Sequence, residues 1–376
     1  MGTNGLKLAI FTPFKKHPVQ SGLKFLVIQQ KMIGDVLTST VICENLKQHF
    51  PNCRIDFIAN ENTLAVLQHN PYIDEIILFK NQYRKQKSAF FKFLKEIKKE
   101  RYHAVIDAYG KLESNLISLF ARAEFKIALK KWYSSWIYTH TIKENLTPNG
   151  NIPLAIENRL QLLNPILGSK NTYFTHPRIF LTATEIDGAL KKLETVKTDP
   201  AQKLIMIGIL GSSPLKTYPA AYMAELLDSI CENSKAILLF NYIPSQQNDA
   251  RAIYEKCSIK TKERIIFDFY ANSLRDFIAL LSQCDALIGN EGGAVNMAKA
   301  LDVPTFSIFS PFIMKGAWHS EIRKEHAGVH LADYRPELFA NLDKKAIKKN
   351  IRQLYSAFNP MLFNGLLRPF LKEYCS

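Results

Sequence analysis

The chain has 376 residues, of which 47% are hydrophobic and 22% are charged, and its formal net charge is +15. This composition excludes intrinsic disorder and provides enough apolar material for two cores, in domains of about 150 to 200 residues each. The sequence contains no run of about 20 apolar residues that could span a bilayer.

Residues 1–23 lack the apolar centre of a signal peptide, because prolines and lysines interrupt them. We therefore expect a cytoplasmic protein. The six cysteines are scattered without Cys-x-x-Cys spacing, so neither a zinc site nor a disulfide framework is supported. Reduced and mostly buried thiols are expected, with no bound metal.

Strand-like and helix-like segments alternate along the whole chain, which is typical of parallel βαβ units. In the first half, strands are predicted at 25–28, 54–59, 75–79, 104–108 and 125–129. Helices are predicted at 36–50, 63–69, 87–100 and 112–123. In the second half, strands are predicted at 204–210, 236–241, 264–267, 286–289 and 305–309. Helices are predicted there at 220–232, 247–257, 274–283 and 295–301.

This α/β pattern predicts two doubly wound sheets, with a boundary near 173–199, where proline and polar residues collect. We assign 1–178 to an N-terminal doubly wound domain and 179–345 to a C-terminal one. Residues 346–376 are expected to form a helical tail that packs back on the N-terminal domain. A central cleft between the domains would face the carboxyl ends of both sets of strands.

The first predicted strand runs directly into a turn in which Gly34 precedes Asp35, and a helix follows at once. In open α/β sheets, ligands bind beyond the carboxyl ends of the strands, where glycine allows close backbone approach and the next helix offers free N–H groups. Asp35 is therefore placed to contact a ligand bound there. Its alternative role is to cap the helix that follows.

Positive charge is concentrated between Lys80 and Lys131, where there are fourteen Lys or Arg residues and only five Asp or Glu residues. Such an excess favours an anionic partner, namely a phosphorylated glycolipid, a membrane surface or nucleic acid; the alternative is a solvated charged face. The predicted helix 87–100 carries an apolar stripe, with lysines elsewhere. It either rests on an anionic bilayer or turns its stripe to the core. The stripe consists of Phe90, Phe93, Leu94 and Ile97.

The loop 210–219 also follows a buried strand. The hydroxyls of Ser212 and Ser213, free backbone amides and Lys216 suit a diphosphate there, and the lysine would neutralise charge that grows on a leaving group. The alternative is an exposed lysine without a role.

A third strand-to-helix turn contains the paired glycines Gly292 and Gly293. Unpaired N–H groups and the helix dipole at such a turn favour an anion, although glycine pairs also serve ordinary tight turns. Glu291 would repel phosphate if it pointed inward. We therefore expect it to cap backbone amides or to accept hydrogen bonds from sugar hydroxyls.

Together these segments resemble glycosyltransferase family 9, the heptosyltransferase family of lipopolysaccharide assembly. The resemblance covers residues 24 to 345 and keeps the family's order and spacing. The matching pieces are IGDVLT at 33–38 with HFP at 49–51 and RIDFI at 54–58, YHAVID at 102–107 with Ser114, GSS at 211–213 with Lys216 and Pro219, and the segment 289–304.

This resemblance implies a GT-B fold, in which the N-terminal Rossmann-like domain 1–178 binds the acceptor and the C-terminal Rossmann-like domain 179–345 binds the nucleotide-sugar donor. It also implies inverting transfer from an ADP-activated sugar, without a metal or other cofactor. Asp35 falls on the family's general base, and Lys216 falls on its donor-phosphate lysine. No Asp-x-Asp triplet occurs in the sequence, in agreement with metal-free chemistry. The full set of expected donor contacts is Gly34, Ser212, Ser213, Lys216, Gln246, Glu291, Gly292, Gly293 and Asn296.

The chain departs from the family pattern at the donor side. Where the family usually has Asp-(Ser/Thr)-Gly and then a histidine, this chain has EGG at 291–293 and then Asn296. Gln246 and Gln247 stand where the family often has a ribose-contacting acid. These positions lie against the sugar and diphosphate, so they leave the identity of the donor open.

The expected function is transfer of a sugar, heptose from an ADP-heptose-type donor, onto a lipopolysaccharide core or related anionic surface glycolipid. The expected partners are the donor, that acceptor and the cytoplasmic surface of the inner membrane, without nucleic acid. The alternatives are a catalytically silent nucleotide-sugar-binding protein and a GT-B epimerase. Asp35 favours the transferase, because a silent binder has no use for a base in the acceptor-side loop.

Overall fold

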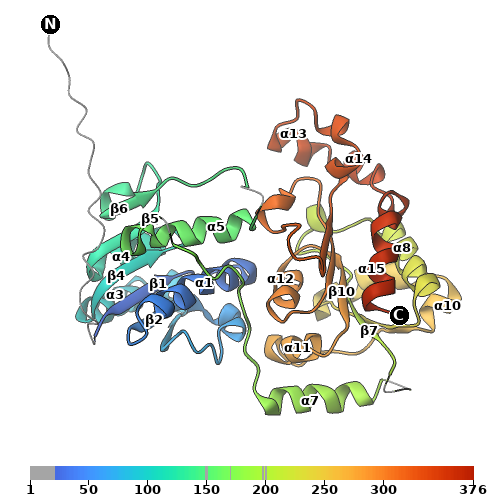
Figure 1. Cartoon of the computed structure of the whole chain (residues 1–376), viewed down its shortest axis with the longest axis horizontal. Coiled ribbons are helices and arrows are strands. Elements are labelled where there is room, and N and C mark those ends of the chain that lie inside the picture. Colours follow the sequence, from blue (N-terminus) through green and yellow to red (C-terminus); the bar gives the residue numbers. More distant parts are fainter. Residues whose placement is uncertain (1–21, 149–150, 170, 197–198, 200) are drawn as a thin grey trace, which may run out of the picture.

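The computed structural model describes residues 22–148, 151–169, 171–196, 199 and 201–376. Residues 1–21, on which the signal-peptide argument chiefly rests, lie outside them. The described chain forms two six-stranded parallel sheets with helices on both faces, one domain after the other (Figure 1). This arrangement confirms the predicted pair of doubly wound domains.

The first sheet has the order β3-β2-β1-β4-β5-β6. Its strands are β1 (Lys24–Ile28), β2 (Arg54–Asn60), β3 (Glu75–Phe79), β4 (Arg101–Asp107), β5 (Arg122–Leu129) and β6 (His140–Ile142). Its helices are α1 (Ile33–His49), α2 (Gln82–Lys85), α3 (Lys87–Lys99), α4 (Leu112–Phe120), α5 (Leu154–Leu160) and α6 (Asn164–Leu167). Because β1 is central and paired on both sides, its apolar run is buried.

The second sheet has the order β12-β11-β10-β7-β8-β9. Its strands are β7 (Leu204–Gly208), β8 (Ile237–Phe240), β9 (Ile265–Ile266), β10 (Ala286–Asn290), β11 (Thr305–Ile308) and β12 (His326–Val329). The helices are α7 (Ala183–Glu194), α8 (Ala220–Asn233), α9 (Gln247–Tyr254), α10 (Ile259–Lys262), α11 (Leu274–Leu281), α12 (Gly293–Ala300), α13 (Lys344–Lys349), α14 (Ile351–Ser356) and α15 (Asn364–Tyr374).

Both sheets share one topology, and the direction of winding reverses beside the first strand of each. The reversal lies between β1 and β4 in the first sheet and between β7 and β10 in the second. Such a switch point opens a crevice at the carboxyl ends of the strands. The loops that follow β1, β7 and β10 are the three that the sequence singled out.

All ten predicted strands are present, and the differences lie at the edges and connections. The segment 63–69 is not an α-helix; a 3₁₀ turn at Glu61–Val66 stands there instead. The short edge strands β6 and β12 and the helices α5 and α7 were not predicted. Three or four residues at a sheet edge carry too little periodicity to be recognised.

The apolar stripe of α3 faces the core, so the bilayer interpretation of that stripe is wrong. Phe93, Leu94 and Ile97 are buried in a cluster with β1, β4 and α4, and Phe90 packs against it. Phe91 is 48% exposed and makes an edge contact with Phe120. The lysines of α3 remain on its exposed side.

The C-terminal tail packs on the second domain, which corrects the expectation that 346–376 would return to the first. Phe363, Leu367, Phe370 and Leu371 are buried in one cluster with residues of β7, β8, β10 and β11. The hydroxyl of Tyr218, which is fully buried, donates to the backbone carbonyl of Phe358. In Figure 1, α15 lies beside α8, on the side of the second sheet away from the first domain.

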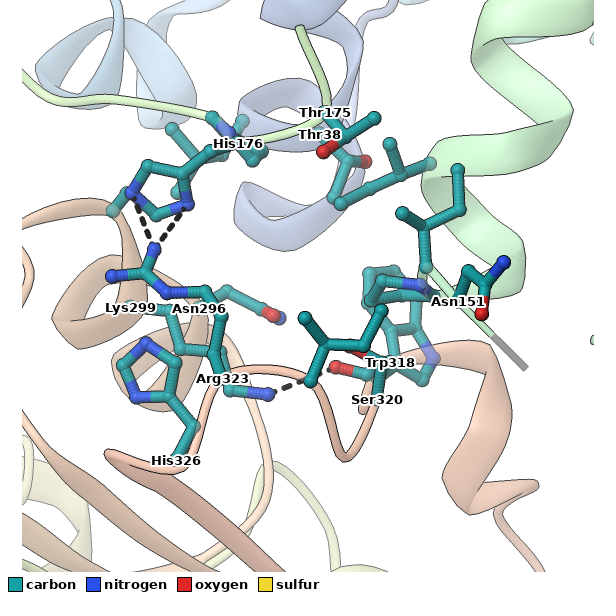
Figure 2. Close-up of a pocket in the computed structure, with 17 residues that line it drawn as sticks. Thr38, Asn151, Thr175, His176, Asn296, Lys299, Trp318, Ser320, Arg323 and His326 are labelled. Atoms are coloured by element: carbon teal, nitrogen blue, oxygen red, sulfur yellow. Dashed lines mark hydrogen bonds between the residues drawn. The ribbon is translucent and has the colours of Figure 1, made fainter.

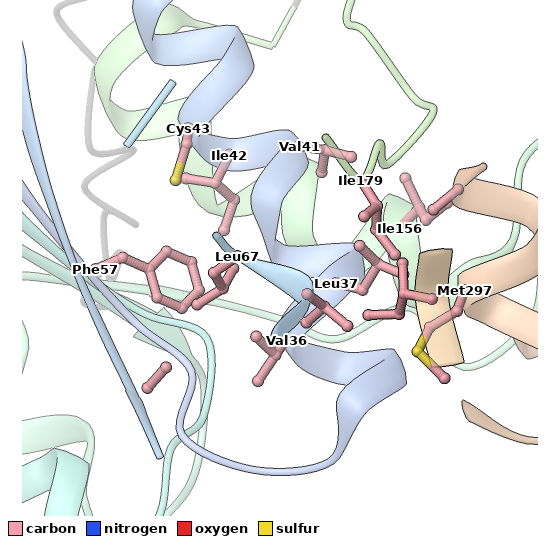
Figure 3. Packing of buried hydrophobic residues seen from close by; sticks show 14 of the residues in the cluster. Val36, Leu37, Val41, Ile42, Cys43, Phe57, Leu67, Ile156, Ile179 and Met297 are labelled. Carbon is pink, nitrogen blue, oxygen red and sulfur yellow. The ribbon is translucent and has the colours of Figure 1, made fainter. Parts of the chain in front are cut away.

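Helix α1 connects the two domains through a continuous apolar core. It is buried along most of its length. Figure 3 shows Ile42 on the side of Phe57 from β2, and Leu37 on the side of Met297 from α12. Because α1 and α12 contact each other, the turns that precede them are held face to face across the domain interface.

Candidate active site

A cavity of about 590 Å³ lies between the domains at the carboxyl ends of β1, β7 and β10. Lys31, Asn60 and Arg84 from the first domain line it as well, and Trp318 lines it from the second. Eight of the predicted site residues lie together here. They are Gly34, Asp35, Ser212, Lys216, Glu291, Gly292, Gly293 and Asn296.

The two remaining predicted residues, Ser213 and Gln246, line an adjoining cavity of about 460 Å³ that shares Ser212. This second cavity lies between the loop after β7 and α9. The Gln246 amide nitrogen donates to the carbonyl of Gly211 at 3.3 Å, and its oxygen accepts from the backbone N–H of Ile243 at 3.2 Å. Gln246 therefore supports the loop while it borders the cavity.

Asp35 lies in the first turn of α1 but does not cap it. The N-cap position is Met32, whose backbone has φ 60, a conformation that non-glycine residues adopt rarely and that often marks functional turns. The Asp35 Oδ1 atom accepts a hydrogen bond from Arg159 Nη2 at 2.6 Å. The capping alternative is therefore wrong.

Arg159 is a site residue that the sequence reasoning missed. It comes from α5 and is only 13% exposed at its side chain, and it also reaches the carbonyl of Ala155 at 3.2 Å and the hydroxyl of Ser39 at 3.4 Å. These bonds fix the guanidinium, which in turn fixes the carboxylate. In the described part of the chain no group bonds to Oδ2 of Asp35, so that oxygen is available to accept a proton.

Lys216 and Glu291 form an ion pair across the loops that follow β7 and β10. Lys216 Nζ lies 3.2 Å from Glu291 Oε1, although the two are not aligned as a hydrogen bond. Glu291 is 7% exposed. The expected capping of backbone amides by Glu291 is absent among the described contacts. An anionic ligand at Lys216 would compete with this carboxylate.

Two glycines of the candidate site lie very close to neighbouring residues, and at Gly211 the neighbour is backbone. A Cβ at Gly211 would lie 2.2 Å from the carbonyl oxygen of Lys216, so only glycine permits the tight loop that carries the lysine. A Cβ at Gly34 would lie 2.6 Å from the Asn296 amide nitrogen, which shows how closely the two domains meet. Asn296 thus lies opposite the turn that carries Asp35.

The described residues contain no group of three or more His, Cys, Asp or Glu side chains suited to hold a metal ion. Five of the six cysteines are buried, in agreement with the expectation of mostly buried thiols. Within the described chain no helix is both long and apolar enough to cross a membrane.

The family model of glycosyltransferase family 9 (heptosyltransferase) matches residues 90–321, which is more than half of the chain. The chain belongs to glycosyltransferase family 9. A curated relative is lipopolysaccharide heptosyltransferase 1 of Campylobacter coli, which is 25% identical over 296 residues. That alignment covers 76% of this chain and 84% of the relative.

Solved structures confirm the GT-B fold of this family 9 glycosyltransferase. A glycosyltransferase family 9 protein from Veillonella parvula superposes with a TM-score of 0.76 at 18% identity, covering 93% of this chain and 97% of that one. The Escherichia coli ADP-heptose lipopolysaccharide heptosyltransferase II superposes with a TM-score of 0.66 at 14% identity, covering 89% and 99%.

Proposed function

We propose that this glycosyltransferase is an inverting, metal-independent enzyme that moves heptose from an ADP-heptose-type donor onto a lipopolysaccharide core or related surface glycolipid. The observation that carries the proposal is the single cavity that brings Asp35 of one domain together with Lys216, Gly292 and Gly293 of the other. The names of the similar proteins, which specify ADP-heptose and lipopolysaccharide, support the choice of donor and acceptor.

In the proposed reaction, a hydroxyl oxygen of the acceptor attacks the anomeric carbon of the donor sugar. The new carbon–oxygen bond forms as the bond to the diphosphate breaks, and ADP leaves with that electron pair. Asp35 takes the proton from the attacking hydroxyl as general base. A single displacement from the face opposite the leaving group inverts the anomeric centre.

The second domain supplies the positive potential that the leaving diphosphate needs. Lys216 would exchange its ion pair with Glu291 for the phosphates, and the N–H groups at the start of α12 add the helix dipole. Since these groups stabilise charge that grows during bond breaking, they act mainly on the transition state. We expect no cofactor.

The acceptor side is polar and basic, which suits a hydroxylated anionic glycolipid. Lys31, Asn60, Asn81 and Arg84 line the first-domain wall of the cavity. Arg84 Nε donates to Glu113 Oε1 at 3.0 Å, and Arg84 Nη2 lies 3.5 Å from Gln30 Oε1. The outer nitrogens of this guanidinium are therefore placed to contact a ligand in the cavity.

We further propose peripheral contact with the cytoplasmic face of the inner membrane through an exposed patch near this wall. Trp132 is 92% exposed, Trp136 is 73% exposed and Leu112 is 72% exposed. The turn that carries Trp136 packs on α4, which begins at Leu112. Exposed tryptophans beside lysines are typical of membrane interfaces. We name Leu112, Trp132, Tyr133 and Trp136 the aromatic patch.

The test is a transfer assay with ADP-heptose and a lipopolysaccharide acceptor that lacks the added sugar, followed by mass spectrometry. We expect a mass gain of one heptose, unchanged activity in EDTA, and ligand-linked stabilisation by ADP-sugars rather than GDP- or UDP-sugars. That stabilisation reaches about 2.7 kcal/mol at a hundredfold excess over Kd. Binding without transfer would favour a silent protein, and loss of activity in EDTA with rescue by Mg²⁺ would contradict the metal-independent mechanism.

A further inference from the structure

A separate cavity of about 170 Å³ lies on the other side of the contact between α1 and α12. Its walls come from both domains and from the connecting segment, with Thr38 from α1, Ile156 from α5, Thr175 from the connection and Lys299 from α12. Figure 2 shows His176, Arg323, Lys299 and His326 gathered at one side, with Asn151 and Ser320 at the other. Asn296 and Trp318 border both this cavity and the candidate active site.

The lining of this cavity is cationic, and the acids that compensate Arg323 lie outside the lining. No Asp or Glu is among its described lining residues, whereas Lys299 and Arg323 are. Arg323 is held by Asp302 at 2.7 Å and Glu325 at 2.6 Å, both outside the lining. The Lys299 ammonium donates to the carbonyl of Trp318 at 2.9 Å, and no carboxylate of the described chain pairs with it.

The positive charge of Lys299 is therefore poorly stabilised. Burial, followed by the nearby Arg323 charge, lowers the pKa of Lys299 to about 8. An ammonium that is partly desolvated and faces a second cation is stabilised by a bound anion.

His326 supplies an independent observation. Its side chain is 5% exposed, its Nδ1 lies 3.3 Å from the Thr305 hydroxyl, and its Nε2 has no hydrogen-bond partner. Burial and the charge of Lys299 lower the pKa of His326 to about 3, so the ring is neutral at pH 7. A buried polar atom without a partner destabilises the protein, and a ligand that bonds to it would remove that cost.

The rest of the cavity is small and mainly apolar, with polar groups added by Thr38, Asn151, Thr175, Asn296 and Ser320. Leu37, Ile152, Ile156 and Ile322 form its walls together with Trp318. The volume corresponds to about five water molecules, which is enough for a short organic group. A ligand that fits these walls carries its charge at one end only.

We propose that this cavity binds a small amphiphilic anion, in which a carboxylate or phosphate group contacts Lys299 and His326 and a short apolar body contacts the isoleucine walls. Since the ligand would touch both domains and their connection, it would hold them in the arrangement seen here. This inference goes beyond the proposed function and does not depend on it.

Trp318 provides the readout, because it is the one tryptophan of the three that lines this cavity. In a W132F/W136F background, benzoate and phenyl phosphate are titrated against Trp318 fluorescence both without and with ADP, and benzamide and inorganic phosphate serve as comparisons. We expect saturable binding of at least one organic anion, at least tenfold tighter than benzamide and than inorganic phosphate. No saturation by either organic anion, equal binding of benzamide, or equal binding of inorganic phosphate would overturn the proposal.

The matched variants are Lys299→Gln, which keeps a donor for the Trp318 carbonyl, and Lys324→Met, which removes an exposed lysine outside the lining. We expect Lys299→Gln to weaken binding of the organic anion at least tenfold and Lys324→Met to leave it unchanged. Equal affinity in wild type and Lys299→Gln, or displacement of the organic anion by ADP, would show that the fluorescence change arises from binding outside this cavity. Either result would refute the site. Circular dichroism confirms that both variants are folded.

Discussion

Asp35 and Arg159 are 124 residues apart in the chain and 2.6 Å apart at their side chains. The guanidinium limits the rotation of the carboxylate, while Oδ2 stays open to the acceptor. Orientation of this kind matters because a displacement of about 1 Å at a reacting group can cost 10²-fold in rate. Arg159 is thus a positioning residue for the proposed base.

We predict that Arg159→Met lowers kcat by about 10- to 10²-fold while ADP affinity stays unchanged, because the arginine orients Asp35 and does not contact the donor. Arg159→Lys should recover part of the rate. Steady-state kinetics and calorimetry with ADP provide the two readouts. A kcat equal to wild type in Arg159→Met would remove this arginine from the mechanism.

Lys216→Ala should weaken ADP binding by roughly 10- to 100-fold, the range of a lost charge-assisted contact of about 1.5–3 kcal/mol. The variant also leaves the buried Glu291 carboxylate unpaired beside the phosphates. Calorimetry with ADP checks this, with Lys324→Ala as the surface control. Unchanged ADP affinity would show that Lys216 has no role in binding the diphosphate, as the alternative of an exposed lysine without a role states.

At the scale of elements, local patterns predicted the ten principal strands and the three site loops, because apolar runs and glycine turns are written into adjacent residues. These local patterns could not identify contacts between residues that are distant in sequence. The apolar stripe of α3 and the apolar side chains of the tail both had to be buried, but amphipathicity does not indicate which surface they pack against. Arg159 was missed for a different reason, because it lies on α5, a helix that the sequence periodicity did not reveal.

The tail makes a testable contribution to the second domain. Phe363 is fully buried and packs against Phe306 and Phe358. We predict that Phe363→Ala lowers the free energy of unfolding by about 3–5 kcal/mol. Urea denaturation measures this, with the half-exposed Phe91→Ala as control, for which a change within about 1 kcal/mol is expected. Equal effects of the two substitutions would contradict the docking of the tail.

For the whole molecule, the excess of positive charge between Lys80 and Lys131 and the exposed aromatic patch lie on the same domain. The sequence indicated the charge but placed the apolar contact on α3. Only the structure shows that Trp132 and Trp136 are exposed while the stripe of α3 is buried. The proposed membrane contact therefore combines the aromatic patch with solvated lysines.

We predict salt-sensitive cosedimentation with anionic vesicles and much weaker binding to neutral ones, because each Lys or Arg near an anionic leaflet contributes about 1 kcal/mol and salt screens it. A Trp132→Ser/Trp136→Ser variant should bind less at every salt concentration. Neutralising Lys92, Lys95, Lys98 and Lys99 should chiefly reduce the salt-sensitive part. Binding that is unaffected by the two tryptophan changes would rule out the aromatic patch as the contact.

The proposed mechanism as a whole depends on Asp35 as the group that takes the acceptor proton. The most direct measurement compares wild type with Asp35→Asn in turnover and in ADP affinity on the same preparations. The account predicts turnover lower by about 10²- to 10⁴-fold, the usual scale for a lost general base, with nearly unchanged ADP affinity. Turnover like that of wild type in Asp35→Asn would contradict it.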